Sequence, residues 1–477
     1  MTPLSVSLAH ALPEIVLATG VLALVLYGAI RGKPSDGPVT EIAVGLLGAA
    51  LLVIVLGFKG DAVVFDGAMI DDAFGRFMKA LALVGSLVAL IMGQDFLRRA
   101  GIDKFEFPIL VLLATLGMMV LISAQNLIAM YLGLELMSLA LYVLAAFWRE
   151  DQRASEAGLK YFVLGALSSG MLLYGASLIY GFSGSVSFAD IAAATRGHAS
   201  LGVVFGLVFL MTGLAFKMSA VPFHMWTPDV YEGAPTPVTA FFASAVKMAA
   251  VAITVRVLVA AFPDAGAQWR QIIVFISILS MALGSFAAIG QENVKRLMAY
   301  SAIGHVGFAL VGLAAGTQDG VFGVIAYMAI YLVMTLGAFA VILAMRVEGR
   351  PVERIGDLAG LAKTRPGMAF GFAMLMFSLA GVPPLAGFFA KWYVFNAAIQ
   401  AHLYALAVIG VLTSAVGAYY YLRIVKIMYF DEPAPAFDRT SPALSAVLAI
   451  STLFVLFLFV YPSPFVAVTA SAARSLF

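Results

Sequence analysis

The sequence contains no cysteine, and only 11% of its 477 residues carry a formal charge. Without cysteine the chain can form no disulfide, no thiolate metal site and no cysteine-held iron–sulfur cluster. The net charge of +2 gives no strongly basic face for a nucleic acid. No phosphate-binding loop, metal-spaced histidine cluster or nucleophile–base motif stands out either. We therefore expect a chain that holds no metal, cofactor or redox centre of its own.

Hydrophobic residues make up 62% of the sequence, whereas soluble domains are roughly half apolar and a quarter charged. This composition predicts an all-α polytopic membrane protein. A crossing helix needs about 20 apolar residues, and on that basis we predict about fourteen transmembrane helices. The predicted segments are Leu12–Ile30, Ile42–Phe58, Phe77–Leu97, Phe107–Ser123, Leu127–Phe147, Tyr161–Tyr180, Leu201–Val221, Val238–Ala261, Ile272–Gly290, Met298–Ala315, Val321–Met345, Met368–Ala401, Leu403–Met428 and Leu444–Tyr461.

Two of these segments carry helix-breaking residues. The twelfth, Met368–Ala401, would run about 50 Å as one helix, against a hydrocarbon core of about 30 Å. It contains Pro383-Pro384, and proline removes backbone donors and interrupts a regular helix. The seventh segment is interrupted in a similar way at Pro222. We therefore predict that helices 7 and 12 are broken, which a membrane protein tolerates only where protein or water satisfies the freed backbone groups.

The two breaks belong to a wider echo in the sequence. Leu116-Gly117 is followed by Gln125-Asn126, and Leu283-Gly284 is followed by Gln291 and Asn293. The offset is about five helices, and an odd offset inverts the topology. We predict two inverted five-helix repeats, 107–261 and 272–428, between an N-terminal unit of three helices, 1–106, and a C-terminal helix in 429–477.

Four charged residues stand out within the apolar segments: Glu135, Lys217, Lys247 and Lys391, whereas aspartate and arginine appear only toward the segment ends. Each costs about 2.5–3.5 kcal/mol at the centre of a membrane helix, so it persists only if it is paired, hydrated or used. Lysine suits proton transfer because burial and a nearby carboxylate shift its proton affinity in opposite directions. If Glu135 pairs with Lys217, moving the carboxylate would switch the lysine. The alternative is a static buried ion pair that fixes helix packing.

Two histidines need separate interpretations. His305 lies within the tenth segment and could relay protons between lysines, or it could simply be hydrogen-bonded inside the bundle. His224 follows the break in the seventh segment, and we favour an interfacial position for it. Asp229 and Glu232 come shortly afterwards, in a predicted loop, where we expect them to be solvated. For Tyr327 and its neighbours, aromatic packing is the favoured interpretation.

Three motifs carry a family resemblance. They are Pro222–Pro235, with Lys217 before it and Lys247 after it, then Gln291–His305 and Leu134–Ser138. Together they resemble the antiporter-like membrane subunits of respiratory complex I, which are similar in turn to the large subunits of multisubunit sodium/proton antiporters. The resemblance covers essentially the whole chain.

The resemblance also implies roles for individual residues in proton transfer. Glu135 would modulate Lys217, Lys247 would be the central relay, and Lys391 would pass the proton to the outer side. His305 would lie on the path between Lys247 and Lys391.

The implied function is proton translocation by a membrane-arm subunit of NADH–quinone oxidoreductase. Flavin, iron–sulfur clusters and quinone would belong to partner subunits, and the neighbours in the bilayer would be other membrane-arm and antiporter-like subunits. One alternative is a subunit of a multisubunit sodium/proton antiporter, and a second is a hydrogenase-linked relative of complex I. A third is a structural membrane scaffold that moves nothing.

Basic residues predict the orientation. Most lysines and arginines outside the apolar segments follow odd-numbered helices, for example Arg98, Arg99, Arg346 and Arg350. Cytoplasmic loops are the ones enriched in lysine and arginine. We therefore predict that both termini lie on the periplasmic side of a bacterial inner membrane.

Overall fold

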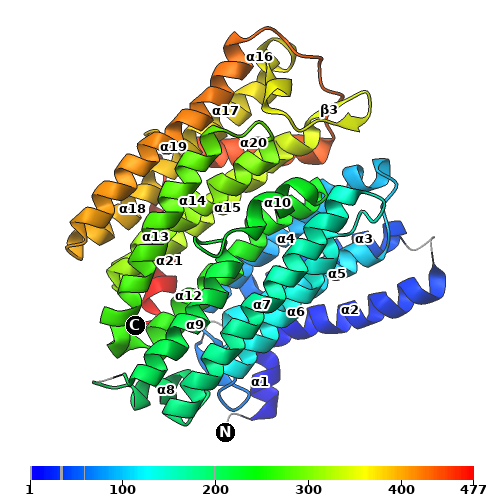
Figure 1. Ribbon diagram of the computed structural model, residues 1–477. Coiled ribbons are helices and arrows are strands. Elements are labelled where there is room, and N and C mark those ends of the chain that lie inside the picture. The colour runs from blue at the N-terminus through cyan, green and yellow to red at the C-terminus, as the bar shows by residue number, and fades with distance from the viewer. Residues whose placement is uncertain (1–2, 33–35, 58–59, 198) are drawn as a thin grey trace.

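The computed structural model describes residues 3–32, 36–57, 60–197 and 199–477, and these form a bundle of long helices (Figure 1). Phe58, which ends the second predicted segment, and the first two residues of the predicted N-terminal unit lie outside the described residues. In its first half the chain forms α1 (Leu4–His10), α2 (Leu12–Arg31), α3 (Asp36–Leu56), α4 (Ala73–Arg99), α5 (Glu106–Ser123), α6 (Leu127–Ala145), α7 (Gln152–Ser183), α8 (Phe188–Ala194), α9 (Leu201–Met218), α10 (Trp226–Gly233), α11 (Thr236–Phe241), the π-helix η2 (Phe242–Val246), α12 (Lys247–Arg256) and the π-helix η3 (Val257–Ala261).

The second half continues with the 3-10 helix η4 (Pro263–Ala265), α13 (Gly266–Ile289), α14 (Val294–Ala315), α15 (Gln318–Ala344), the 3-10 helix η5 (Ile355–Leu358), α16 (Leu361–Thr364), α17 (Pro366–Ala380), α18 (Ala386–Gln400), α19 (Tyr404–Phe430), α20 (Pro442–Phe457) and α21 (Ser463–Arg474). Two short antiparallel hairpins join helices. In one, β1 (Ala62–Val64) pairs with β2 (Met69–Asp71); in the other, β3 (Arg346–Val347) pairs with β4 (Arg350–Pro351).

Within the described residues, twelve helical stretches are long and apolar enough to cross a membrane. The predicted twelfth segment is divided into α17 and α18, as its prolines indicate. In the predicted last segment, Leu444–Tyr461, one helix, α20, covers the residues as far as Phe457. A further helix, α21, begins after this segment at Ser463, beside Pro462 and Pro464. The sequence-based prediction missed α21 because its apolar run is short.

The centre of the bundle is formed by α12, α14 and α15, which are buried almost all round. A helix that is hydrophobic all round belongs in such a core. In Figure 1 these helices lie between the blue and cyan N-terminal helices and the yellow and orange C-terminal ones. Two of the predicted site residues, Lys247 and His305, are thereby placed at the centre of the protein.

The two ends of the bundle differ. In Figure 1 both chain termini lie towards the lower end, whereas α16 and the β3–β4 hairpin lie at the upper end. The last helix, α21, packs against α15 and α4, and the backbone N–H of Phe74 donates to Ser475 Oγ at 2.9 Å. The C-terminus is therefore tied to the start of α4 at the lower end.

Candidate functional site: a row of buried charges

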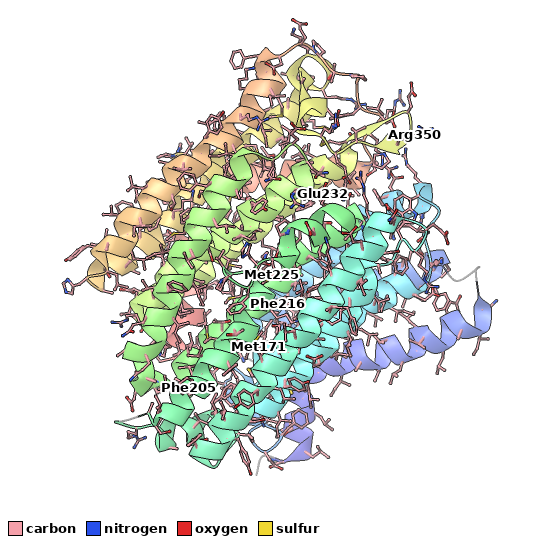
Figure 2. The ribbon with its side chains drawn as sticks, viewed as in Figure 1. Met171, Phe205, Phe216, Met225, Glu232 and Arg350 are labelled. Carbon is pink, nitrogen blue, oxygen red and sulfur yellow. The ribbon has the colours of Figure 1, made fainter. Side chains whose placement is uncertain are left out.

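The break between α9 and α10 leaves carbonyl groups that the helix no longer satisfies. Helix α9 ends at Met218, and Ser219 adopts a left-handed conformation with φ of 65°. The last four carbonyls of a helix lack partners within it. Trp226 Nε1 donates to Phe216 O at 2.9 Å, and side chains from other helices supply further donors. Figure 2 shows Phe216 and Met225, which flank the break, about midway along the bundle.

Lys217 lies in the last turn of α9 and is 2% exposed. Its Nζ donates to Tyr142 Oη at 3.1 Å. It also lies over three aromatic rings, those of Tyr142 at 5.1 Å, Phe216 at 5.4 Å and Tyr161 at 5.7 Å. Cation–π contacts and the negative end of a helix both favour an ammonium group. The site can therefore hold a charged lysine without a carboxylate in direct contact.

Glu135 lies on α6, two turns before Tyr142 on the same helix. In the part of the chain that the structure describes, its carboxylate forms no ion pair with Lys217, and its Oε1 is buried without a hydrogen-bond partner. Glu135 and Tyr142 are seven residues apart, so they lie on the same side of α6. The hydroxyl of Tyr142, rather than the carboxylate of Glu135, makes the direct contact with the lysine.

Lys247 begins α12 directly after the π-helix η2, and it is 1% exposed. Its Nζ donates to Met218 O at 3.1 Å and to Ser219 Oγ at 2.9 Å, both at the end of α9. The Tyr231 ring lies 5.8 Å from this nitrogen. Lys247 therefore satisfies a backbone carbonyl that the break has freed. Single π turns within α-helices occur frequently at functional sites.

Lys391, on α18, repeats this arrangement at the second break. Its Nζ donates to Ala380 O at 2.8 Å and Leu379 O at 3.2 Å, the last carbonyls of α17, and to Ser414 Oγ at 2.8 Å. Gly381 follows α17 with φ of 90°, a conformation that suits glycine. Lys247 and Lys391 are far apart in the chain, and each of them binds the carbonyl end of a broken helix.

His305 lies on α14 within the core, and both of its ring nitrogens are hydrogen-bonded. Nδ1 is 2.7 Å from Tyr327 Oη and Nε2 is 3.0 Å from Tyr421 Oη. Tyr421 Oη is in turn 2.5 Å from Ser301 Oγ. A hydroxyl can both donate and accept, so the cluster can rearrange its protons without moving a heavy atom. The aromatic-packing interpretation of Tyr327 is therefore incomplete, because its hydroxyl binds the histidine.

Aromatic side chains lie between these sites. Phe308, one turn from His305 on α14, has its ring 4.9 Å from Lys391 Nζ. On the other side, Tyr161 contacts Lys217, and its ring stacks on Trp226 at 4.3 Å. The four lysine and histidine groups are not hydrogen-bonded directly to one another within the described residues, so any proton transfer between them needs bridging groups.

The prediction that Asp229 and Glu232 lie in a loop was wrong. Both lie in α10, and both carboxylates bind the Arg296 guanidinium, at 2.8 Å and 3.0 Å. Asp229 also accepts from Lys160 Nζ at 2.7 Å. These ion pairs join α10 to α14 and α7. They form because the chain after the break continues as the helix α10, where a loop was expected. His224, in the non-helical stretch after α9, is half-buried with its Nδ1 lacking a partner.

A polar cavity of about 640 Å³ lies beyond the start of α11, at the upper end of the bundle. Its lining includes Glu232, Thr236, Lys295 and Glu353. Lys295 Nζ is 2.7 Å from Glu353 Oε1 and donates to Ala234 O at 3.0 Å. From Thr236 to Lys247 the chain advances by about 16 Å along the helix. The cavity therefore lies about three helical turns from the central lysine.

Sequence reasoning missed two buried ion pairs outside this row. Arg256 Nη1 and Nη2 bind the two carboxylate oxygens of Asp72 at 2.7 and 2.8 Å. Lys79 Nζ lies 2.6 Å from Glu14 Oε1. Each charge lies near a helix end, where a solvated position was the simpler expectation. The four charges are visible in the sequence, but the sequence does not say which residues meet.

No group of three or more histidine, aspartate or glutamate side chains is arranged to hold a metal ion in the described ranges.

Gly165 offers a direct test of the Tyr142–Lys217 contact. It lies on α7, where an added Cβ would stand 2.6 Å from Tyr142 Cζ and closer still to the hydroxyl. Gly165→Ala should therefore push Tyr142 off Lys217, and displacing a group by about 1 Å can cost about 10²-fold in rate. Gly170→Ala is the matched control, because nothing lies within 4 Å of a Cβ there on the same helix. Equal proton-transfer rates in the two variants would exclude a role for the contact.

Broken helices with buried lysines at their ends, set in a bundle of membrane helices, define a membrane transport protein. Residues 124–417 match the family described as the transmembrane region of NADH:quinone oxidoreductase and Mrp antiporters. A relative from Beijerinckia indica subsp. indica, NADH-quinone oxidoreductase subunit N, is 76% identical over the whole of both chains. Its counterpart in Methylobacterium nodulans is 62% identical over 99% of this chain and 98% of that one.

Solved structures agree. A chain of respiratory complex I from Thermus thermophilus superposes with a TM-score of 0.84 at 34% identity, covering 96% of this chain and 99% of that one. A chain of the Mrp complex from Dietzia shares the fold, with a TM-score of 0.86 at 24% identity and 98% of each chain covered. The chain belongs to the family of antiporter-like membrane subunits of NADH-quinone oxidoreductase, and within it to the relatives named subunit N.

Proposed function

We propose that this chain translocates protons across the bacterial inner membrane as a membrane-arm subunit of NADH–quinone oxidoreductase. The observation that carries the proposal is a row of titratable side chains inside the bundle, in which Glu135 is half-buried and Lys217, Lys247, His305 and Lys391 are buried. Buried ionisable groups in a membrane protein mark ion paths and proton relays. The relatives named as subunits of this enzyme support the same conclusion.

The Glu135–Lys217 end of the row acts as the switch. Among the described residues, one carboxylate oxygen of Glu135 is buried without a hydrogen-bond partner, and Tyr142 on the same helix contacts Lys217. A change in the position or charge of Glu135 alters the proton affinity of Lys217, since a nearby negative charge favours the ammonium form. Tyr142, bonded to Lys217, provides the hydroxyl through which the lysine gives up or receives its proton.

The proton then passes to Lys247, along the His305 cluster and on to Lys391. The polar cavity lined by Lys295 and Glu353 is the route of proton uptake towards Lys247. Lys247 and Lys391 bind the carbonyl groups at the breaks through hydrogens on Nζ. A neutral amine still carries such hydrogens, so it can donate to the same carbonyls. Each lysine can therefore lose one proton and keep its place.

The proposal includes the number of membrane crossings, the internal repeats and the orientation of the chain. We propose fourteen crossings, counting α17 with α18 and α20 with α21 as one crossing each, and two inverted repeats, 107–261 and 272–428. The presence of one broken helix in each repeat, α9 before α10 and α17 before α18, supports this symmetry. The termini face the periplasm, which agrees with their common position at the end opposite the arginine-bearing β3–β4 hairpin (Figures 1 and 2).

The redox chemistry takes place on partner subunits. Those subunits hold flavin, iron–sulfur clusters and quinone, and neighbouring antiporter-like subunits adjoin this chain in the membrane. Energy from NADH oxidation reaches the row of charges as a change in charge or position near Glu135. The half-buried place of Glu135, among exposed leucines such as Leu132 and Leu139, leaves it open to a neighbour in the bilayer.

Purification in mild detergent by a tag at Phe477 tests the assignment. We expect flavin, iron–sulfur absorbance and NADH–quinone activity to accompany the chain. Purification with membrane partners only, together with sodium/proton exchange in vesicles that NADH does not drive, would instead establish the antiporter function.

A further inference from the structure

An apolar groove opens on the membrane-facing surface between α17 and α20. Its volume is about 720 Å³, and Phe370, Leu448, Leu453 and Leu456 form much of its wall. Phe370 and Leu453 are about half exposed, so the groove faces outward rather than into the bundle. At Gly371 the two helices approach so closely that a Cβ would lie 2.9 Å from Thr452 Oγ1, which closes the floor.

The mouth of the groove is basic. Arg365 directly precedes α17, and Arg439 lies just before α20, so both arginines stand at the same end of the two helices that form the walls. Arg365 Nη2 donates to Phe437 O at 2.8 Å and Asp438 O at 2.7 Å, which fixes the direction of its guanidinium. Thr440 Oγ1, also in the lining, is buried and has no hydrogen-bond partner within the part of the chain that the structure describes. Among the described residues that line the groove, none is acidic.

The dimensions fit one leaflet of a bilayer. The leucine wall from Leu444 to Leu456 on α20 runs for about 18 Å. Half of the hydrocarbon core is about 15 Å thick. An arginine guanidinium matches a phosphate with two parallel hydrogen bonds, and the arginines stand at the end where a headgroup would lie.

A second apolar groove lacks the combination of an apolar wall with a basic mouth free of acidic residues. Between α5, α6 and α7 an apolar groove of about 840 Å³ also has basic residues at its edge, Lys104 and Arg149. There, however, Glu106 lines the groove as well. A carboxylate beside the basic groups opposes an anionic headgroup, so charge singles out the groove between α17 and α20.

We propose that the groove between α17 and α20 binds an anionic phospholipid, with its phosphate at Arg365 and Arg439 and an acyl chain along the leucines of α20. The lipid holds α17 against α20. The far end of α17 carries the carbonyls of Leu379 and Ala380 that Lys391 binds, so the lipid also fixes the helix that positions this lysine.

Photolabelling of the intact, purified assembly tests the proposal. It is reconstituted with phosphatidylglycerol or with phosphatidylcholine, each carrying a diazirine on one acyl chain, and the labelled peptides are identified by mass spectrometry. We expect phosphatidylglycerol to label peptides of α17 and α20 about five-fold more than phosphatidylcholine, the preference that one surface arginine supplies for an anionic lipid. Arg439→Gln should remove that preference, and Ala449→Phe, which fills the groove, should lower labelling by both lipids.

Arg350→Gln is the control, because Arg350 is an exposed arginine near the same end of the molecule but outside the groove (Figure 2). It should leave labelling unchanged. Equal labelling by the two lipids, or an equal effect of Arg350→Gln and Arg439→Gln, would overturn the proposal. Absence of labelling in the groove by either lipid would also overturn it and would indicate that a helix of a partner subunit fills the groove.

Discussion

Replacing Lys247 by methionine should stop proton transfer through this chain. Methionine fills nearly the same space but has no proton to give, and losing a positioned proton-transfer group typically costs about 10²- to 10⁴-fold in rate. The change also leaves Met218 O without the Nζ donor, at a cost of about 1–3 kcal/mol. We therefore expect reduced pumping together with a modest loss of stability. Both can be followed in vesicles by NADH-driven acidification and by the amount of assembled enzyme.

Lys247→Arg separates the two effects. An arginine can still donate to the carbonyl at the break, but it does not lose its proton under any physiological condition. A relay role predicts that this variant assembles and fails to pump. A scaffold role predicts that it both assembles and pumps. Lys363→Met, at an exposed lysine near α16, serves as the control and should change neither quantity.

Breaking the buried pair of Asp72 and Arg256 should have the largest effect on stability. Arg256 is 1% exposed, and it also donates from Nε to Ile122 O at 3.0 Å. Asp72→Ala leaves this guanidinium buried without a counter-charge, which costs about 3–5 kcal/mol. We expect a clear fall in the thermal unfolding temperature and in the amount of assembled enzyme.

The double variant Asp72→Ala with Arg256→Met is the test of mechanism. Replacing both charges by apolar groups is often neutral, so the double variant should be more stable than Asp72→Ala alone. If the two variants were equally unstable, the pair would not be the cause. Such a result would point instead to the N-terminal cap that Asp72 provides for α4 by accepting from the Gly75 N–H.

The pH dependence of this pair follows from its surroundings. Burial alone would raise the pKa of the Asp72 carboxyl, but the Arg256 guanidinium outweighs this and lowers the pKa below the ordinary value of 3.8. A carboxyl whose pKa falls on folding stabilises the protein above its unfolded pKa and loses this effect as the pH falls through the folded pKa. The pair should therefore persist at neutral pH and weaken only below about pH 4.

The parts of the fold that could be predicted were those with a strong local cause. Pro222 and Pro383-Pro384 break their helices wherever the rest of the chain goes, and α9 and α17 end within four residues before them. The buried lysines were visible because an ammonium group stands out within a long apolar run. The resemblance to a known family added their roles, which remain proposals.

The parts that could not be predicted depend on contacts between distant segments. Asp72 and Arg256 are 184 residues apart, and neither lies deep inside an apolar run. Tyr142, Tyr327 and Tyr421 look the same in the sequence as tyrosines that only pack, and their hydroxyl partners are chosen by tertiary structure. The opposite charges of Glu135 and Lys217 suggest that the two residues pair directly. In the structure, Tyr142 makes the direct contact with the lysine instead.

The number of protons pumped per NADH oxidised tests the central claim most directly, measured in sealed vesicles for the intact assembly carrying Lys217→Ala. Lys217 is held by a hydroxyl and three aromatic rings rather than by a carboxylate, so its loss leaves no unpaired carboxylate in direct contact. We predict that the assembly forms and that this number falls below that of the unchanged enzyme. An assembled variant that pumps the same number of protons per NADH would contradict the proposal that the buried row carries them.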